Sequence, residues 1–197
     1  MTEPPLARHL REATRDAHRD AEEAFDLDSR TASRREYAGL LLALHAFHSC
    51  AEQRLRAVDG WDALGPPVDL AARERASLLE QDLAHLGVPV SPPAFPVTLP
   101  SLESLPAALG CLYVLEGSRL GGALVARRAV SALGADLPVT FFSSGGRPTG
   151  ADWRSFQRSL DGFGATAGDG GAGAAVATAR HTFSAFVECL RTRGVPS

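Results

Sequence analysis

Apolar residues recur every three or four positions over most of the chain, which is the spacing of one face of an α-helix. The first such stretch, from about Leu6 to Phe25, follows two prolines and is expected to form one helix. No segment alternates convincingly as a β-strand, and the nearest case, Val139 to Phe142, is short. The pattern predicts an all-α bundle of roughly six to eight helices. Further helices are expected at about Ser33 to Val58, Asp69 to Leu86, Leu102 to Leu133, Asp152 to Phe163 and Ala174 to Arg193.

The segments between these helices are rich in proline and glycine. Val88 to Pro100 holds five prolines and is expected to be an ordered or extended crossover. Gly134 to Gly150 is expected to be a long loop, and Gly164 to Gly173 a flexible one. The run Gly168 to Gly173 matches the GxGxxG spacing of dinucleotide sites, but no strand precedes it. The loop interpretation is therefore preferred.

Composition narrows the function without identifying it. The 197 residues, 45% of them hydrophobic, suit one domain over 1–197 with an ample core. The net charge of −3 gives no overall basic field for nucleic acid. All 20 basic residues are arginines, so Schiff-base and Walker-lysine chemistry is excluded.

The cysteines and the apolar runs suit a cytoplasmic protein. Cys50, Cys111 and Cys189 are an odd number without CxxC spacing, as expected for buried thiols in a reducing cytosol. The first ten residues contain no apolar core of a signal peptide. The most apolar run, near Leu105 to Val125, is interrupted by charged residues, so no membrane span is predicted.

The helix predicted from Leu102 to Leu133 has glycines at 110, 117, 121 and 122. Each interior glycine costs roughly 1 kcal/mol relative to alanine, and four cost roughly 3–4 kcal/mol. At about 100° per residue, Gly110, Gly117 and Gly121 fall on nearly one line along the helix. Another helix or a flat ligand could therefore lie directly on this backbone.

His18 lies beside the apolar face of the first helix, with Glu22 one turn further on. A lone histidine there is more often an ordinary core residue than a ligand. A carboxylate one turn away can accept a hydrogen bond from the imidazole, as in many metal-bound histidines. His45 and His48 could form a metal pair, but ordinary core or surface histidines are the preferred interpretation.

Two other chemistries find little support. Carboxylate-bridged di-iron bundles need repeated Glu-x-x-His pairs, and only Asp82 to His85 is similar. A hydrolase elbow of Gly-x-Ser-x-Gly is missing from the sequence, and Ser118 has no histidine near it in the chain.

The stretches at 10–22 and 113–122 resemble the haem oxygenase family, closest to the bacterial branch that supplies biliverdin to bacteriophytochromes. One resembles the family's proximal helix and the other its distal helix, in the family's order and with a fitting separation. A weaker match covers 153–155 and 159–161. The resemblance spans the chain except the proline-rich crossover and the late glycine-rich loop. The two stretches are Leu10-Arg11-Glu12-Ala13-Thr14-Arg15-Asp16-Ala17-His18-Arg19-Asp20-Ala21-Glu22 and Tyr113-Val114-Leu115-Glu116-Gly117-Ser118-Arg119-Leu120-Gly121-Gly122.

The resemblance implies a single-domain helical bundle of the haem oxygenase type, with haem sandwiched between proximal and distal helices. His18 would be the axial ligand of the haem iron, and Glu22 its hydrogen-bonding partner. Gly117 and Gly121 would let the distal backbone approach haem and its bound O2, with Gly122 beside them.

The resemblance also implies residues at the haem edge. Arg154 would pair with a propionate, and Arg11 falls where the family has a basic residue. Tyr113 lies within one position of a tyrosine that contacts a propionate in some members. Many members have aspartate after the first distal glycine, where it organises a water chain for protons, but this chain has Ser118. A serine hydroxyl holds a water without supplying a carboxylate, so protons would travel through other waters or another polar group.

The implied reaction opens haem to biliverdin with release of CO and Fe2+. It uses O2 and an external electron donor, a reductase or ferredoxin, since no flavin or iron–sulfur motif is present. The branch implies a bacteriophytochrome as receiver of biliverdin, and no nucleic-acid or membrane partner. The alternative, motivated by Ser118, is a non-catalytic haem-binding or haem-delivery protein. A more distant one is a related bundle that binds another flat ligand.

Overall fold

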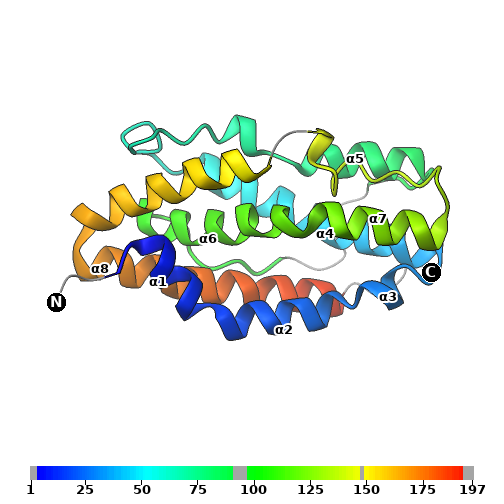
Figure 1. The fold of residues 1–197 in the computed structure, drawn as a ribbon, viewed down its shortest axis with the longest axis horizontal. Helices are drawn as coiled ribbons and strands as arrows, with labels where there is room; N and C mark the ends of the chain where they lie inside the picture. Colours follow the sequence, from blue (N-terminus) through cyan, green and yellow to red (C-terminus); the bar gives the residue numbers. More distant parts are fainter. Residues whose placement is uncertain (1–3, 91–96, 147–148, 193–197) are drawn as a thin grey trace.

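The computed structural model describes residues 4–90, 97–146 and 149–192 (Figure 1). Within these ranges the regular elements are all helices, which confirms the all-α prediction, and 139–142 is irregular. The elements are α1 (Leu6–Ala13), α2 (Arg15–Phe25), α3 (Leu27–Arg30), α4 (Arg34–Arg56), η1 (Ala71–Arg73), α5 (Ala76–His85), α6 (Leu105–Ser118), η2 (Arg119–Gly121), α7 (Gly122–Leu133), η3 (Ser144–Gly146) and α8 (Thr149–Thr192), where η marks a short 3-10 helix.

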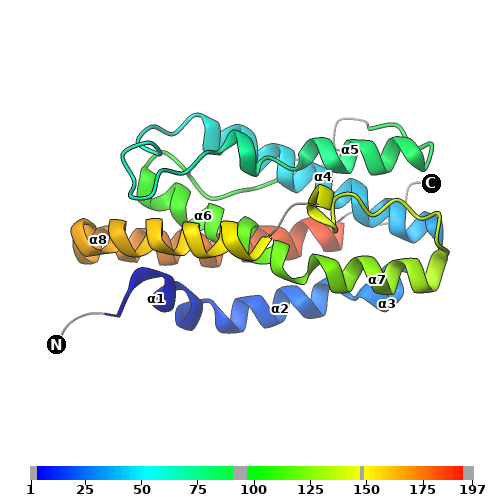
Figure 2. The same ribbon diagram turned by 45° about the horizontal axis from the view of Figure 1, so that its top comes forward.

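The helices form an elongated bundle. In Figures 1 and 2, α1, α2 and α3 follow one another along one side, α4 and α5 pack together on the other, and α6, α7 and α8 lie between them. The packed core runs through the centre, where α4 and α6 bury most of their side chains. The two segments that resemble the proximal and distal helices thereby come to face each other.

The predicted first helix is divided at Thr14. The Thr14 hydroxyl donates to the carbonyl of Leu10 at 2.8 Å, and its backbone leaves the helical region. A threonine that bonds to the preceding turn often bends a helix. The start of α1 is fixed from far away, because the N–H of Ala7 donates to Asp161 of α8 at 2.9 Å. The bend lets α1 and α2 follow different parts of α8.

The second predicted helix is confirmed as α4, with Ser33 accepting the N–H of Glu36 at 3.1 Å as a helix cap. The third is shorter than expected, because Glu52 of α4 accepts the N–H groups of Arg75 and Ala76 at 2.9 and 3.2 Å. These bonds cap the start of α5 and separate it from η1.

The glycine-rich segment 164–173 is helical, so the prediction of a flexible loop was wrong. Gly168 alone leaves the helical region, at φ 65°, and both views show the chain turning back on itself there (Figures 1 and 2). A left-handed φ favours glycine, which has no Cβ. A Cβ on Gly164 would lie 2.7 Å from the Cβ of Leu6, so this glycine lets α1 approach α8.

The remaining linkers are only partly described. The described ends of the proline-rich crossover, 88–90 and 97–100, are irregular, and 91–96 lie outside the described residues. In the loop predicted at 134–150, η3 is a single turn, α8 begins at Thr149, and Arg147 and Pro148 lie outside the described residues. Arg193, the predicted end of the last helix, also lies outside them.

Two expectations about composition can be compared with the fold. Cys111 and Cys189 are buried and Cys50 is partly buried, with no disulfide among these three residues, and burial raises the pKa of Cys111 to about 12. Across the described ranges, one stretch, Leu105–Leu133, is long and apolar enough to cross a membrane. Because 61% of its apolar window is buried within the protein, it has the character of a core helix.

Candidate functional site

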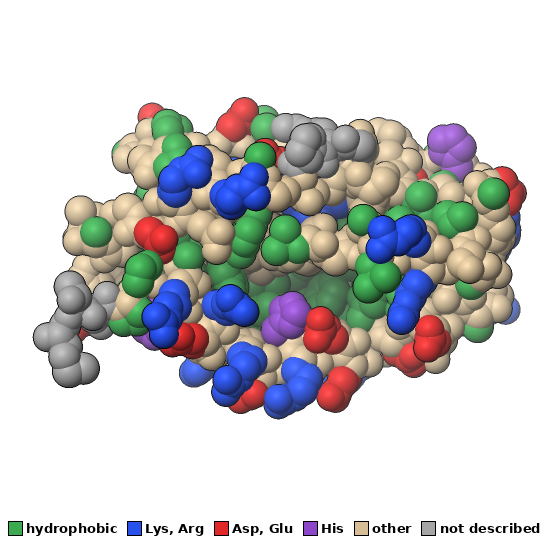
Figure 3. Space-filling model, in the orientation of Figure 1, with side chains coloured by type: hydrophobic (Ala, Val, Ile, Leu, Met, Phe, Trp, Pro, Cys, Tyr) green, Lys and Arg blue, Asp and Glu red, His purple; other side chains and the backbone are tan. Residues whose placement is uncertain are grey.

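A cavity of about 1510 Å³ lies between the helices α1 and α2 on one side and α6, η2 and α7 on the other. Figure 3 shows it as a hollow with hydrophobic side chains inside and arginine side chains around its rim. Aromatic rings form much of its lining, namely Phe25, Phe47, Tyr113, Phe141, Phe142, Trp153, Phe183 and Phe186. Its size and apolar lining suit one large, mostly apolar ligand.

The wall formed by α2 carries His18. This side chain lines the cavity, and its ring stands edge-on to Phe183 with the centroids 5.7 Å apart. The carboxylate of Glu22 lies 3.7 Å from His18 Nδ1, which is longer than a hydrogen bond. The hydrogen-bonding role of Glu22 therefore stays a prediction.

The opposite wall is bare backbone at two glycines. A Cβ built on Gly121 would have no atom within 4 Å, and one on Gly117 would meet only the Trp153 ring at 3.9 Å. Both residues line the cavity. Nothing in the described protein requires glycine at these two positions for packing. Their missing side chains keep the cavity wide in front of the backbone.

The other two glycines are explained by packing between segments. A Cβ on Gly110 would overlap the carbonyl oxygen of Ala175, so this glycine lets α6 pack directly on α8. A Cβ on Gly122 would overlap the carbonyl of Phe142, although Gly122 also lines the cavity. Of the two candidates predicted to lie on this stripe, another helix lies on Gly110, whereas Gly117 and Gly121 face the cavity. The expected single helix also divides, because η2 interrupts it between Gly117 and Gly122.

Ser118 lies at the end of α6 and lines the cavity. Its hydroxyl donates to the carbonyl of Leu115 at 2.7 Å. The single proton of the hydroxyl is thus committed to the backbone, and only the oxygen lone pairs remain to accept from a water.

Of the residues expected at the ligand's edge, the structure brings Arg11 and Tyr113 to the cavity and leaves Arg154 outside its lining. Arg154 is exposed, and its guanidinium lies near Gly150. Trp153 and Gln157 of the same helix line the cavity instead, and the pairing of Arg154 with a propionate stays a prediction. Burial raises the pKa of Tyr113 against the opposing effects of Thr14 and Arg11, so its phenol stays protonated.

The inner end of the cavity holds polar residues that were not predicted to line it, and of these His48 had been considered only for a metal pair. His48 is buried there, with Nδ1 3.3 Å from Glu52, and Arg75 stacks on the Phe141 ring at 4.1 Å. Burial lowers the pKa of His48 and holds the imidazole neutral. Burial also lowers the pKa of Arg75 to about 10, which leaves it charged at neutral pH. A signal existed in the sequence, because His48 and Glu52 repeat the four-residue spacing of His18 and Glu22.

The metal pair considered for His45 and His48 does not form. His45 bonds to Glu80 at 3.0 Å and to Ser49 at 3.2 Å, while His48 bonds to Glu52. Among the described residues there is no group of three or more histidine, cysteine, aspartate or glutamate side chains placed to hold a metal ion.

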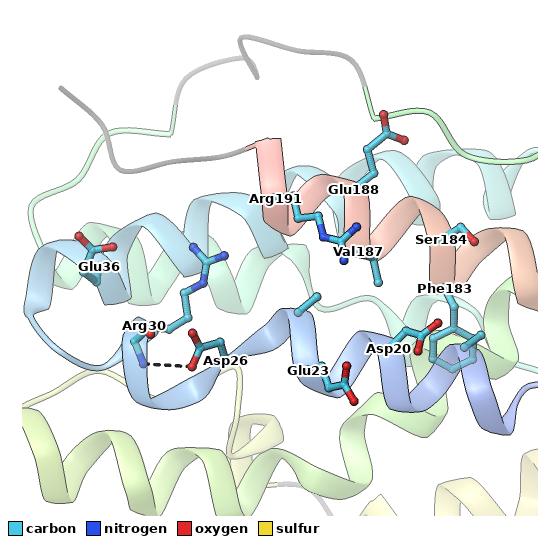
Figure 4. A pocket seen from close by; sticks show the side chains of 13 residues that line it. Asp20, Glu23, Asp26, Arg30, Glu36, Phe183, Ser184, Val187, Glu188 and Arg191 are labelled. Carbon is cyan, nitrogen blue, oxygen red and sulfur yellow. Dashed lines mark hydrogen bonds between the residues drawn. The ribbon is translucent and has the colours of Figure 1, made fainter.

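A second hollow of about 960 Å³ lies between α2, α3 and the end of α8 (Figure 4). Its lining includes the carboxylates of Asp20, Glu23, Asp26, Glu36 and Glu188, with the arginines Arg30 and Arg191. Arg30 donates to the carbonyl of Leu190 at 2.8 Å and so joins α3 to α8. This acidic lining would repel an anionic ligand, whereas Arg8, Arg11 and Arg15 line the larger cavity.

The fold and the larger cavity define a class of protein. It is an all-α protein with a cavity between an imidazole on one wall and bare backbone on the other, and this shape, with arginines at the rim, suits a large flat ligand that carries anionic groups.

Comparisons with known proteins identify the family. Residues 4–192 match the family model described as "Heme oxygenase". The chain is 33% identical over 156 residues to "Heme oxygenase PigA" of Pseudomonas aeruginosa, covering 76% of this chain and 74% of that protein. Its fold is similar to that of the NO- and CO-bound haem oxygenase from Neisseria meningitidis, with a TM-score of 0.76 at 24% identity, over 97% of this chain and 92% of the other. The chain belongs to the haem oxygenase family and is an enzyme of haem degradation.

Proposed function

We propose that this enzyme opens haem to biliverdin with release of CO and Fe2+, using O2 and electrons from a separate reductase or ferredoxin. The observation that carries the proposal is the pairing of His18 with the bare backbone of Gly117 and Gly121 across one cavity. Haem is flat, largely apolar and edged by two propionates, so it suits this shape and lining. When bound, haem supplies the iron that activates oxygen.

The protein's own residues bind and orient this substrate. His18 would ligate the iron through the nitrogen turned away from Glu22, and the other face of the haem would be turned toward the glycine wall. Gly117 and Gly121 would let the distal backbone lie against that face, because a side chain at either position would occupy the cavity. Arg11, exposed at the rim, would pair with a propionate.

Protons would reach the site through water. Ser118 would accept a hydrogen bond from one such water, since its own proton is given to Leu115. Tyr113, protonated by virtue of its raised pKa, can donate toward the cavity. The nearest carboxylate in sequence, Glu116, is bound to Arg73 and Arg119 and so is not free to relay protons.

We further propose that the enzyme works in the cytoplasm as one domain, without nucleic-acid or membrane partners. A bacteriophytochrome would receive the biliverdin. The resemblance to that bacterial branch supports this partner. The alternative of a non-catalytic haem carrier is not favoured by the family assignment, and a turnover experiment separates the two.

The experiment loads the protein with haemin, adds a reductant system and O2, and follows the absorption spectrum of wild type and Gly121→Leu. Wild type is expected to lose its Soret band as biliverdin absorbance appears. Gly121→Leu should keep the far-UV circular dichroism of the apoprotein while turnover falls about a hundredfold, because its side chain displaces the haem.

Gly110→Ala is the matched control for a packing glycine. Its Cβ overlaps the backbone of α8, so the apoprotein should lose about 1–3 kcal/mol of unfolding free energy by overpacking. A wild-type Soret band that persists with no biliverdin would reject the enzyme in favour of the carrier. Equal loss of helicity and turnover in Gly121→Leu would contradict the role given to the distal backbone.

A further inference from the structure

The turn η2 determines the shape of the distal wall. It joins α6 to α7 and lies between Gly117 and Gly122, and Gly121 is its last residue. A 3-10 turn within a long helical stretch often marks a functional hinge or local strain. Because Gly117 and Gly121 have no side chains to fill the space before them, a shift of this turn changes the cavity directly.

Arg119, the first residue of η2, attaches the turn to two other helices. Its side chain is only 4% exposed. Nη1 donates to both carboxylate oxygens of Glu116 in α6, at 3.0 and 2.9 Å, and Nη2 donates to Asp152 of α8 at 3.1 Å. One rigid guanidinium thus holds the turn at two points in different directions.

Glu116 does not depend on Arg119 alone. The guanidinium of Arg73 in η1 also donates to Glu116, and it stands 5.4 Å from the centre of the Phe156 ring. Removing one arginine would therefore leave this buried carboxylate paired with the other. Asp152 is 34% exposed, so water can solvate it if Arg119 is lost.

Stability alone does not account for this arrangement. Buried ion pairs are often no more stabilising than apolar side chains of the same size. The Nε–H of Arg119 is buried without a hydrogen-bond partner among the described atoms, which is itself unfavourable. What the guanidinium provides, and an apolar side chain cannot, is a fixed direction toward Glu116 and Asp152.

We propose that Arg119 is a positioning residue of the haem site. It holds η2 so that Gly117 and Gly121 keep a fixed position relative to the haem. It thereby determines how the haem is seated and which meso carbon is opened. The part of this inference that concerns the seating of haem and the meso carbon rests on the proposed function. The other part, that Arg119 holds η2 in place, concerns the protein without haem and does not depend on that function.

The test compares Arg119→Met with Arg73→Met. Each variant leaves Glu116 with one arginine, but only Arg119→Met releases η2. In the apoprotein, amide hydrogen exchange at 117–122 should accelerate about tenfold or more in Arg119→Met and less than about twofold in Arg73→Met. With haem, Arg119→Met should produce a mixture of biliverdin isomers, while Arg73→Met should keep the wild-type isomer composition.

Arg119→Lys guards against a variant that fails to fold. Lysine keeps the charge beside Glu116 but lacks the planar fork, so exchange at 117–122 should be intermediate. Wild-type protection in Arg119→Lys or Arg119→Met, or equal acceleration in Arg119→Met and Arg73→Met, would overturn the proposal. If wild type forms no biliverdin, the proposed function fails, while the exchange experiment on the apoprotein still decides whether Arg119 holds the turn.

Discussion

Two histidines in this chain stand four residues before a glutamate, and the fold places the two pairs in opposite surroundings. His18 and Glu22 on α2 have side chains 55% and 70% exposed, and His18 Nδ1 lies 3.7 Å from Glu22 Oε2. His48 and Glu52 on α4 are 4% and 7% exposed, at 3.3 Å. The same local spacing thus produces an accessible imidazole and a buried one.

The difference shows what makes a histidine available to a ligand. Glu52 also accepts the N–H groups of Arg75 and Ala76, so the pair it forms with His48 fixes the start of α5. Glu22 accepts no such bonds in the described structure, and His18 touches the aromatic lining only through Phe183. The His48–Glu52 pair therefore stabilises the fold. The exposed His18–Glu22 pair holds no other element in the described structure, so its imidazole is accessible to a ligand.

The largest expected effect separates the two histidines. His18→Ala should remove the axial-ligand signature from the ferric haem spectrum and reduce turnover by a hundredfold or more, with an unfolding free energy within about 0.5 kcal/mol of wild type. His48→Ala should retain the ferric spectrum and lose about 2–4 kcal/mol of stability, because it leaves a cavity and removes one hydrogen-bond partner of the buried Glu52. Haemin titrations and urea unfolding of the apoproteins measure both. An unchanged ferric spectrum in His18→Ala would show that the axial ligand lies elsewhere.

Substitution of the two glutamates should also separate the buried pair from the exposed one, with smaller losses of unfolding free energy than the histidine variants show. Glu52→Gln keeps the shape of the side chain but weakens charge-assisted bonds to His48, Arg75 and Ala76, so the unfolding free energy should fall by about 1.5–3 kcal/mol. Glu22→Gln should change it by less than about 0.5 kcal/mol, as expected for an exposed pair. Urea unfolding at neutral pH tests this, and equal losses in the two variants would remove the distinction between the pairs.

The smallest expected effect is a pH dependence that belongs to His48. Burial lowers its pKa in the fold, against Glu52 and together with Arg75 and His45, while an unfolded histidine titrates near 6.5. As pH falls through 6.5, the unfolded chain takes up a proton that the native chain does not. Stability should therefore decrease by up to about 1.4 kcal/mol per pH unit.

Glu52 does not contribute in this window. Burial alone would raise its pKa, but His48 and the N–H groups of Arg75 and Ala76 together hold the pKa below its usual value of 4.5. His48→Gln should flatten the stability curve of the apoprotein between about pH 7.5 and 5.5, and His18→Ala should leave its slope as in wild type. A wild-type slope in His48→Gln would assign the effect to another group.

Much of the fold followed from helical periodicity, and the errors have a common cause. The all-α class and the helix at 34–56 depend on local spacing and capping, which a sequence displays directly. The breaks at Thr14, Arg75 and Arg119 were missed. Arg75 bonds to Glu52 and Arg119 bonds to Asp152, and both partners are distant in the chain. At Thr14 a side chain competes with the backbone for one carbonyl.

The predicted site residues also differ in whether packing brings them to the cavity. The resemblance proposed His18, Arg11 and Tyr113, and all three line the cavity. It also proposed Arg154, which is exposed on α8 and lies outside the cavity lining. Which face of a helix meets a cavity depends on how that helix is rotated against its neighbours, and local spacing does not contain that angle.

The sequence by itself determined that this chain is helical and that a histidine and a glutamate share one face of the first helix. It also determined that the distal segment has glycine, which lacks a side chain, at four positions. These are properties of residue identity and spacing. Only the tertiary structure decided that Gly110 and Gly122 admit neighbouring backbone while Gly117 and Gly121 face a cavity, since that depends on what lies opposite each missing Cβ. In the same way, it decided that Arg119 joins Glu116 and Asp152, because 33 residues of sequence separate the partners Arg119 and Asp152 that packing brings together.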